Sequence, residues 1–279
     1  MVQKKKMIFV LILTVLLLSC NLPLGLLEES RPPTNTPVPA TQEAATATQA
    51  ETTATQPAPT ETLPGLEPFA VVTEVIKAEE KAPPSPYVVD IEYPVFSGGP
   101  AGEALAGAAD GINARVLEIV TRQRAGFEEM VKNTPADPQI GPHGFYMRYE
   151  VRQNDGKYTS VYFQLSLYSS GAAHPLPYSE TLNFDVAQNR ALELGELFQP
   201  GTDYLGLLSQ KSLAWLQSEG ITGGEAGAEP TPENYRNWLI TPGGLQIVFD
   251  PYQVAAYAMG YVTYTIPWPE LEDVTNYDG

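Results

Sequence analysis

The residues of this 279-residue chain best suited to chemistry are two histidines, one cysteine and a few loop serines and tyrosines. His143 and His174 both stand near proline and glycine, a composition typical of loops. A zinc hydrolase usually needs three protein ligands, so two histidines would need carboxylates to complete a site. Neither His-Glu-x-x-His nor Gly-x-Ser-x-Gly occurs. We therefore predict no catalytic residue, metal site or cofactor, and interpret His174 as a residue that orders its own loop.

Two segments form the candidate ligand-binding site, because each combines polar or aromatic side chains with a loop composition. Its residues are Ser169, Ser170, Gly171, His174, Pro251, Tyr252 and Tyr257. Tyrosine offers a large contact area to sugars and to proteins at a low entropic cost. The alternative is that both tyrosines pack their loop against a sheet, and the sequence leaves both readings open. Tyr146, Tyr162 and Tyr168 either extend this surface or lie under a helix.

The N-terminal segment has the pattern of an export signal followed by a lipid attachment site. Three lysines at 4–6 precede an apolar run, Met7–Leu18, which is too short to span a ~30 Å hydrocarbon core comfortably. The run ends in Leu17-Leu18-Ser19-Cys20, which resembles the bacterial lipobox and implies a diacylglyceryl group on Cys20. We expect residues 1–19 to be a cleaved signal peptide. The mature protein is then an extracytoplasmic lipoprotein anchored to the cell membrane, or to an outer membrane where there is one.

Residues 20–66 are expected to form a disordered tether, and residues 67–279 one acidic domain with its core in 86–270. Residues 31–66 contain ten threonines and seven prolines, and this composition buries too little apolar surface to fold. Removal of the signal peptide changes the formal charge from −17 to about −20. Such a field repels nucleic acid and attracts basic partners.

The periodicity predicts an α+β fold with a largely antiparallel sheet, one long N-terminal helix and a second helix packed on it. Apolar residues at three- and four-residue spacing place the long helix over 105–131. The clearest hairpin joins 145–152 and 161–167 through Asn154-Asp155-Gly156. The second helix is expected over 204–219, with Asp203 as its N-cap. Further strands are expected at 87–94, 181–186, 235–240, 245–250 and 261–267.

Four groups of motifs, in order, resemble a known pair of envelope domains. Tyr93-Pro94 with Ile112-Asn113 resembles the deacetylase-associated domain of PdaC-like proteins. The other three groups resemble the RsiV-type domain of unknown function: Tyr168–Pro175, Leu182–Asp185 with Leu194–Phe198, and Phe249–Gly260. Relatives with these domains include the extracytoplasmic part of an anti-sigma factor that recognises lysozyme and the non-catalytic region of a peptidoglycan deacetylase. The resemblance implies a recognition module at the cell envelope, without naming its ligand.

Three functions follow as hypotheses. The first is a non-enzymatic binding module for a basic protein such as lysozyme, which the RsiV-like motifs and the negative charge favour. The second is a carbohydrate-binding module for peptidoglycan, which the loop tyrosines favour. The third is an envelope hydrolase with an unrecognised site, whose turnover would be lost in His174→Ala. Ser169 or Ser170 could be paired with His174 as nucleophile and base, but the spacing along the chain does not test this pair. A nucleic-acid partner is not expected.

Overall fold

The computed structural model describes residues 66–277, except 83, 101–104, 106 and 138. All of these residues belong to one compact unit. The expected signal peptide, Cys20 and the tether up to residue 65 lie outside the described residues. Within the described part of the chain, no helix is both long enough and apolar enough to cross a membrane.

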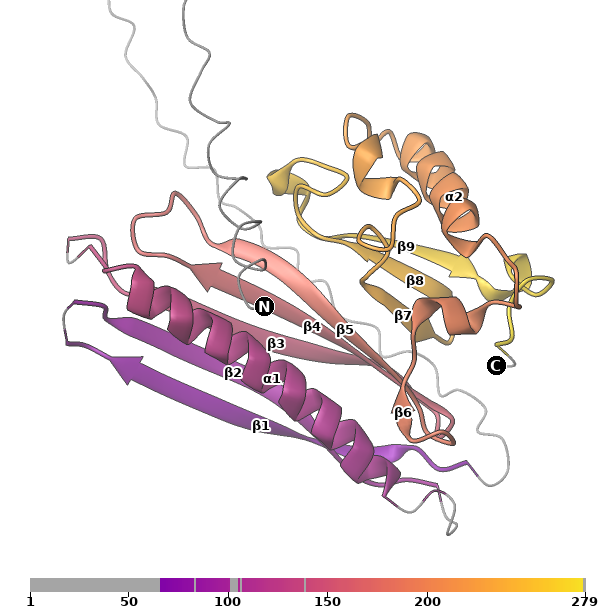
Figure 1. Ribbon diagram of the computed structural model, residues 1–279, viewed down its shortest axis with the longest axis horizontal. Coiled ribbons are helices and arrows are strands. Elements are labelled where there is room, and N and C mark those ends of the chain that lie inside the picture. The colour runs from indigo at the N-terminus through magenta and orange to yellow at the C-terminus, as the bar shows by residue number, and fades with distance from the viewer. Residues whose placement is uncertain (1–65, 83, 101–104, 106, 138, 278–279) are drawn as a thin grey trace, which may run out of the picture. The chain divides into compact units, whose positions relative to one another are not determined.

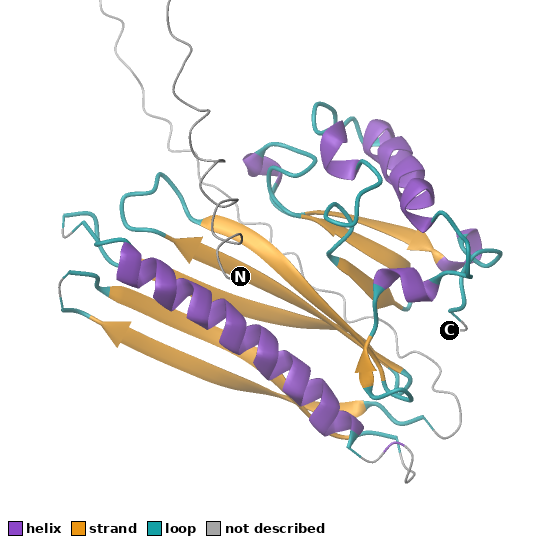
Figure 2. Ribbon diagram, viewed as in Figure 1, coloured by secondary structure: helices purple, strands orange, loops and turns teal. Residues whose placement is uncertain are grey.

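The unit is a mixed α+β structure of four layers, in the order α1, a six-stranded sheet, a three-stranded sheet and α2 (Figure 1, Figure 2). The large sheet consists of β1 (Phe69–Glu80), β2 (Tyr87–Gly98), β3 (His143–Asn154), β4 (Tyr158–Tyr168), β5 (Leu176–Asp185) and β6 (Arg190–Ala191), in that order. The small sheet consists of β7 (Trp238–Thr241), β8 (Gly244–Phe249) and β9 (Val262–Pro267). The helices are α1 (Ala108–Asn133) and α2 (Tyr204–Ser218). Short 3₁₀ turns are η2 (Leu194–Leu197), η3 (Glu225–Ala228), η4 (Tyr257–Met259) and η5 (Trp268–Glu270).

Neighbouring strands are antiparallel except β2 and β3. These two are parallel because α1 lies between them in the chain and returns it to the starting end of the sheet. The prediction of a largely antiparallel α+β fold with two helices is confirmed.

The first core lies between α1 and the large sheet. Residues buried along α1 recur at three- and four-residue spacing, as expected for the helix over 105–131: Ala108, Ile112, Val116, Ile119, Val120, Phe127 and Val131. Asn113 fastens the helix to β2, because its side-chain oxygen accepts the Phe96 amide and its side-chain nitrogen donates to the Phe96 carbonyl, both at 2.8 Å. The placement of this helix as an N-terminal element is not supported, since β1 and β2 precede it.

The second helix packs in a different place from the one expected. α2 begins after Asp203, whose carboxylate accepts the Gly206 amide at 3.0 Å, so the predicted N-cap is confirmed. Its apolar face joins β7–β9 in a separate core, where the Trp215 ring stacks on Tyr264 at 4.9 Å between centroids. The prediction that it packs on the long helix is wrong. The two sheets pack face to face, so each sheet has one remaining face that a helix can cover. α1 covers that of the large sheet and α2 that of the small sheet.

A thin layer of contacts joins the two sheets. Tyr162 of β4 is 2 % exposed and packs with Leu239 and Val248, so it lies under the small sheet and not under a helix. Burial raises the pKa of its hydroxyl to about 12.

Asn183 of β5 forms the central polar link in this layer. Its side-chain oxygen accepts the Ser160 hydroxyl at 2.6 Å and the Ile240 amide at 3.0 Å. Its side-chain nitrogen donates to the Trp238 carbonyl at 2.7 Å. The side-chain amide of Asn183 therefore holds β4, β5 and β7 together. Asn183 also belongs to the segment Leu182–Asp185, one of the motifs on which the family resemblance was based.

Several strands differ in extent from the expected ones: β5 begins at Leu176 and β7 at Trp238, and the differences at β1 and β2 are the largest in consequence. β1 is an additional edge strand, and its start is held by Asn154, whose side chain exchanges two hydrogen bonds with the Phe69 backbone at 3.0 and 2.8 Å. β2 continues through Pro94 to Gly98 instead of ending there. Pro94 fits in β2 because the parallel pairing of β2 with β3 ends at Ile91. Beyond that residue, the amide hydrogen that proline lacks is not needed for a bond to β3.

Candidate functional site

A cluster of three rings brings together two loops that are far apart in the sequence. We call His174, Tyr252 and Tyr257 the ring cluster. The ring centroids of His174 and Tyr257 lie 4.3 Å apart, those of Tyr252 and Tyr257 5.4 Å, and those of His174 and Tyr252 6.4 Å. Tyr252 is 57 % exposed, and His174 is also exposed. The cluster therefore presents aromatic surface to solvent at the β4–β5 turn.

Hydrogen bonds fix the orientation of these rings. His174 Nδ1 lies 2.8 Å from the Pro175 carbonyl, which can only accept, so Nδ1 carries the hydrogen in the neutral ring. Nε2 is then the acceptor for the Tyr252 hydroxyl at 3.4 Å. The Tyr257 hydroxyl also donates to the Pro175 carbonyl, at 3.3 Å. These contacts agree with the interpretation that His174 orders its loop.

The loop between β8 and β9 is anchored beneath Tyr252 by its neighbours. Gln253 donates to the Gly227 and Asn234 carbonyls, both at 2.9 Å, and Val254 is buried in the second core. Tyr252 itself has a φ of 72°, a left-handed conformation that is uncommon for a tyrosine. Pro251 directly precedes it and is half-buried. The fixed backbone on both sides holds the Tyr252 ring outward.

The Asp250 carboxylate connects the start of this loop to β5 by hydrogen bonds. It is 7 % exposed and accepts the Ser179 hydroxyl at 2.5 Å and an Arg236 nitrogen at 2.7 Å. The Asn237 side chain donates to the same Ser179 hydroxyl at 3.0 Å. Sequence reasoning missed these residues, because Ser179 lies 71 positions before its carboxylate partner.

Tyr261 is a second residue that sequence reasoning missed. Its hydroxyl donates to the Leu165 carbonyl at 3.3 Å and the Tyr178 carbonyl at 3.0 Å, which ties β9 to β4 and β5. Burial raises the pKa of this hydroxyl strongly, and nearby Tyr162 and Asp250 raise it further.

Ser170, which lies between Ser169 and Gly171 at the start of the β4–β5 turn, belongs to a different arrangement from His174. The Ser170 hydroxyl donates to the Gly141 carbonyl at 2.8 Å and accepts the Asp137 amide at 2.9 Å. The Ser170 amide donates to Nδ1 of the fully buried His143 at 3.0 Å. The serine hydroxyl is thus engaged with backbone of the α1–β3 loop, which makes it a structural residue of that loop.

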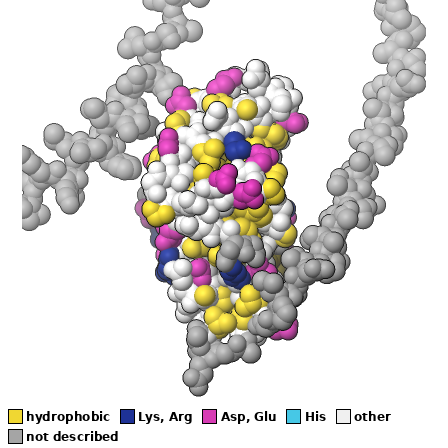
Figure 3. Space-filling model, turned by 90° about the vertical axis from the view of Figure 1, so that its right-hand side faces the viewer, with side chains coloured by type: hydrophobic (Ala, Val, Ile, Leu, Met, Phe, Trp, Pro, Cys, Tyr) yellow, Lys and Arg dark blue, Asp and Glu magenta, His cyan; other side chains and the backbone are white. Residues whose placement is uncertain are grey.

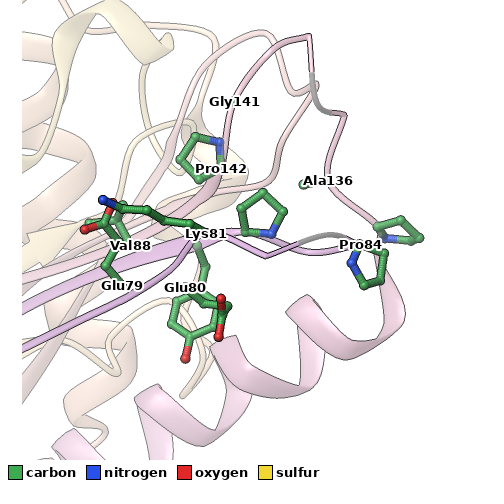
Figure 4. A pocket seen from close by; sticks show the side chains of 11 residues that line it. Glu79, Glu80, Lys81, Pro84, Val88, Ala136, Gly141 and Pro142 are labelled. Atoms are coloured by element: carbon green, nitrogen blue, oxygen red, sulfur yellow. The ribbon is translucent and has the colours of Figure 1, made fainter.

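That loop also borders a pocket of about 580 Å³ at the β1–β2 turn (Figure 4). Its walls are mainly apolar and include Pro84, Pro86, Pro142, Tyr87 and Ala136. Backbone hydrogen bonds join the walls, with Ala136 donating to Pro84 at 3.0 Å and His143 to Pro86 at 2.9 Å. Among the described residues, no group of three His, Cys, Asp or Glu side chains is placed to hold a metal ion.

The comparisons with known proteins agree with this architecture. Residues 195–269 match the family model described as a protein of unknown function, DUF3298. The chain is similar to the peptidoglycan-N-acetylmuramic acid deacetylase PdaC of Bacillus subtilis strain 168, at 25% identity over 189 residues. That match covers 66% of this chain and 38% of PdaC, so the chain spans well under half of its relative's length.

Two crystal structures share the fold. A DUF3298 family protein from Pseudomonas aeruginosa PAO1 matches with a TM-score of 0.53 at 18% identity, covering 74% of this chain and 95% of that one. A member of the same family from Bacteroides fragilis NCTC 9343 matches with a TM-score of 0.50 at 18% identity, covering 75% and 95%. The resemblance indicated by the motifs is therefore confirmed: residues 195–269 match the model of the DUF3298 family, whose function is unknown, and the chain is similar to PdaC and to solved DUF3298 structures.

Proposed function

We propose that this domain is a non-enzymatic binding module that holds a cell-wall glycan against the ring cluster, outside the cell. The observation that carries the proposal is the fixed placement of three rings from two loops, of which His174 and Tyr252 are exposed and Tyr257 is half-buried. Ring faces bind the apolar faces of sugars, while the hydroxyl tips remain available for hydrogen bonds. The printed name of PdaC, a deacetylase of peptidoglycan N-acetylmuramic acid, supports a ligand of this class. The lipid anchor on Cys20 belongs to the same proposal and would keep the module at the envelope.

The geometry around His174 favours binding over hydrolysis. The described contacts of its ring are the Pro175 carbonyl and the two tyrosines, whereas Ser170 is engaged with the α1–β3 loop. A nucleophile–base pair needs the two side chains within hydrogen-bond reach. These contacts of Ser170 and His174 support a binding module over a hydrolase that would use this pair.

Replacing Tyr252 by alanine should weaken sedimentation of the protein with purified peptidoglycan sacculi about tenfold or more, because it removes the more exposed of the two tyrosine rings. Tyr257→Ala should weaken it as well. Tyr252→Phe is the matched control, since it keeps the ring and should bind almost as the parent does. Parent protein that stays in the supernatant, or equal binding by Tyr252→Ala, would contradict the proposal.

A basic protein is the second candidate ligand, and a specific surface favours it. Residues 219–235 contain four exposed glutamates, Glu219, Glu225, Glu229 and Glu233, and no lysine or arginine. Figure 3 shows one face of the unit, on which acidic side chains outnumber basic ones. Such a surface attracts a cationic partner over a range set by the ionic strength.

If a basic protein is the ligand, Glu225→Gln/Glu229→Gln/Glu233→Gln should weaken binding to lysozyme, and raising the salt from 50 to about 300 mM should weaken it further. Tyr252→Ala should leave this binding nearly unchanged, because the substitution removes no charge. Calorimetric titration measures both effects. Binding that depends on the tyrosine and is insensitive to salt would point back to the glycan.

A further inference from the structure

The outer edge of β5 is only partly covered by β6. β5 pairs with β4 along its whole length, from Leu176 to Asp185. β6 pairs only with Phe184 and Asp185, and Leu192 extends this pairing by donating to the Asn183 carbonyl at 2.8 Å. Figure 1 shows the short β6 beside one end of the long β5. The edge before Asn183 therefore has no strand partner among the described residues.

The backbone groups on this edge can be assigned from the alternation of an antiparallel ladder. The Asn183 carbonyl faces β6, and every second residue along a strand directs its amide and carbonyl to the same side. Ser179 and Thr181 therefore direct theirs to the uncovered edge, whereas Tyr178 and Glu180 face β4. An uncovered edge of this kind can accept a further strand.

A polar cleft runs along this edge. Two adjoining cavities of about 470 and 430 Å³ share Arg122, Glu180, Thr181 and Arg236 as lining residues. Residues of α1 form one wall of the cleft. They lie on the face of β5 from which the Tyr178 hydroxyl donates to the Gln123 side chain of α1 at 2.9 Å. The start of β7 and the residues just before it form the other wall. They lie on the opposite face of β5, where the Trp238 amide donates to the Thr181 hydroxyl at 3.3 Å.

Four arginines line this cleft beside three glutamates, Glu118, Glu180 and Glu193, whereas the whole chain has 33 acidic and 16 basic residues. Arg115, Arg122, Arg190 and Arg236 all line it, and their side chains are between 39% and 58% exposed. Each is paired with one carboxylate, from Glu118, Glu180, Glu196 and Asp250 respectively. A guanidinium has five N–H donors. Arg122 and Arg236 each donate through one nitrogen to their carboxylate, which leaves donors that can reach a second anion, whereas Arg190 uses its donors on Glu196, Gln188 and Ala191.

We propose that this cleft binds an extended peptide with two adjacent acidic residues as an added strand on β5. The peptide backbone pairs with the amides and carbonyls of Ser179 and Thr181. Because neighbouring side chains of a strand point to opposite faces, one carboxylate reaches Arg122 on the α1 wall and the next reaches Arg236 on the other. The uncovered edge accommodates about five residues of peptide at roughly 3.3 Å each. This site is separate from the ring cluster and does not depend on the proposed glycan binding.

The test uses the full chain and a blocked hexapeptide with two central glutamates, with hydrogen exchange followed by NMR. In the free protein, the Ser179 and Thr181 amides should exchange much faster than those of Tyr178 and Glu180, and the peptide should protect them. Arg122→Ala should weaken peptide binding about tenfold, because a charge-assisted hydrogen bond is lost.

Arg124→Ala is the matched control for this experiment. Arg124 lies on the same helix and is also paired with a glutamate, Glu128, but it is not among the residues that line the cleft. This variant and Tyr252→Ala should bind the peptide like the parent. Ser179 and Thr181 amides already protected in the free protein would overturn the proposal. So would equal binding of a peptide with lysines in place of the glutamates.

Discussion

Replacing Phe127 by alanine should lower the free energy of unfolding by about 3–5 kcal/mol, the largest effect we expect from a single substitution. The Phe127 ring is 2 % exposed and stacks on Phe145 of β3 at 5.5 Å between centroids. It also meets the edge of the Tyr87 ring of β2 at 5.8 Å. The substitution leaves a cavity where α1 crosses both parallel strands. Equilibrium unfolding in urea measures the loss.

Leu117→Ala is the matched control on the same helix. Leu117 is 48% exposed, so its removal opens no cavity and should cost less than about 1 kcal/mol. A cost for Phe127→Ala as small as that for Leu117→Ala would show that α1 is not held by this packing.

Replacing Asp250 by alanine should cost about 3 kcal/mol of stability, because it leaves the buried Ser179 hydroxyl without its acceptor and removes an acceptor of the Asn237 amide. The substitution also removes the anchor at the start of the loop that holds Tyr252. We therefore expect lower stability together with weaker binding at the ring cluster. Urea unfolding and sacculus sedimentation on the same preparation measure the two effects.

Two variants separate the parts of this network. Arg236→Ala should cost less than about 1 kcal/mol, because the Arg236 side chain is 58% exposed and its ion pair is screened by solvent. Asp250→Asn keeps an oxygen to accept the Ser179 hydroxyl and should lie between the parent and Asp250→Ala. Equal losses for Asp250→Ala and Arg236→Ala would mean that the ion pair, and not the buried hydroxyl, carries the stability.

Local patterns predicted the elements of this fold well. The helix expected over 105–131 is present as α1, because an apolar stripe of that length has few other solutions. The turn at Asn154-Asp155-Gly156 could be predicted because turns favour these residue types. In the structure Gly156 has a φ of 83°, and the Asp155 side chain accepts the Lys157 and Tyr158 amides at 2.8 Å. These features depend on residues close together in the chain.

Long-range packing could not be predicted in the same way. Periodicity shows that α2 has an apolar face, but it does not show which sheet covers that face. The division into two sheets depends on contacts such as Asn183 with Trp238, 55 positions apart. β1 escaped prediction because its apolar residues do not alternate regularly and only Phe69 is buried.

The candidate site was predicted in part, and for a physical reason. His174, Tyr252 and Tyr257 come together as ring-bearing loop residues, although their role as ligand contacts stays a prediction. Ser170 was grouped with His174 because the two are close in sequence, but its hydroxyl bonds to Gly141 on another loop. Sequence distance is a poor guide at a turn, where four residues are enough to reverse the chain.

The separation of the two apolar cores has a consequence for how this chain tolerates sequence change. Between them lie the Tyr162 contacts and a few amide and hydroxyl bonds, so a change of volume in one core has little packed material through which to disturb the other. Substitutions on the two sides should have additive costs. A change of sequence on either side can therefore be accommodated without repacking the other.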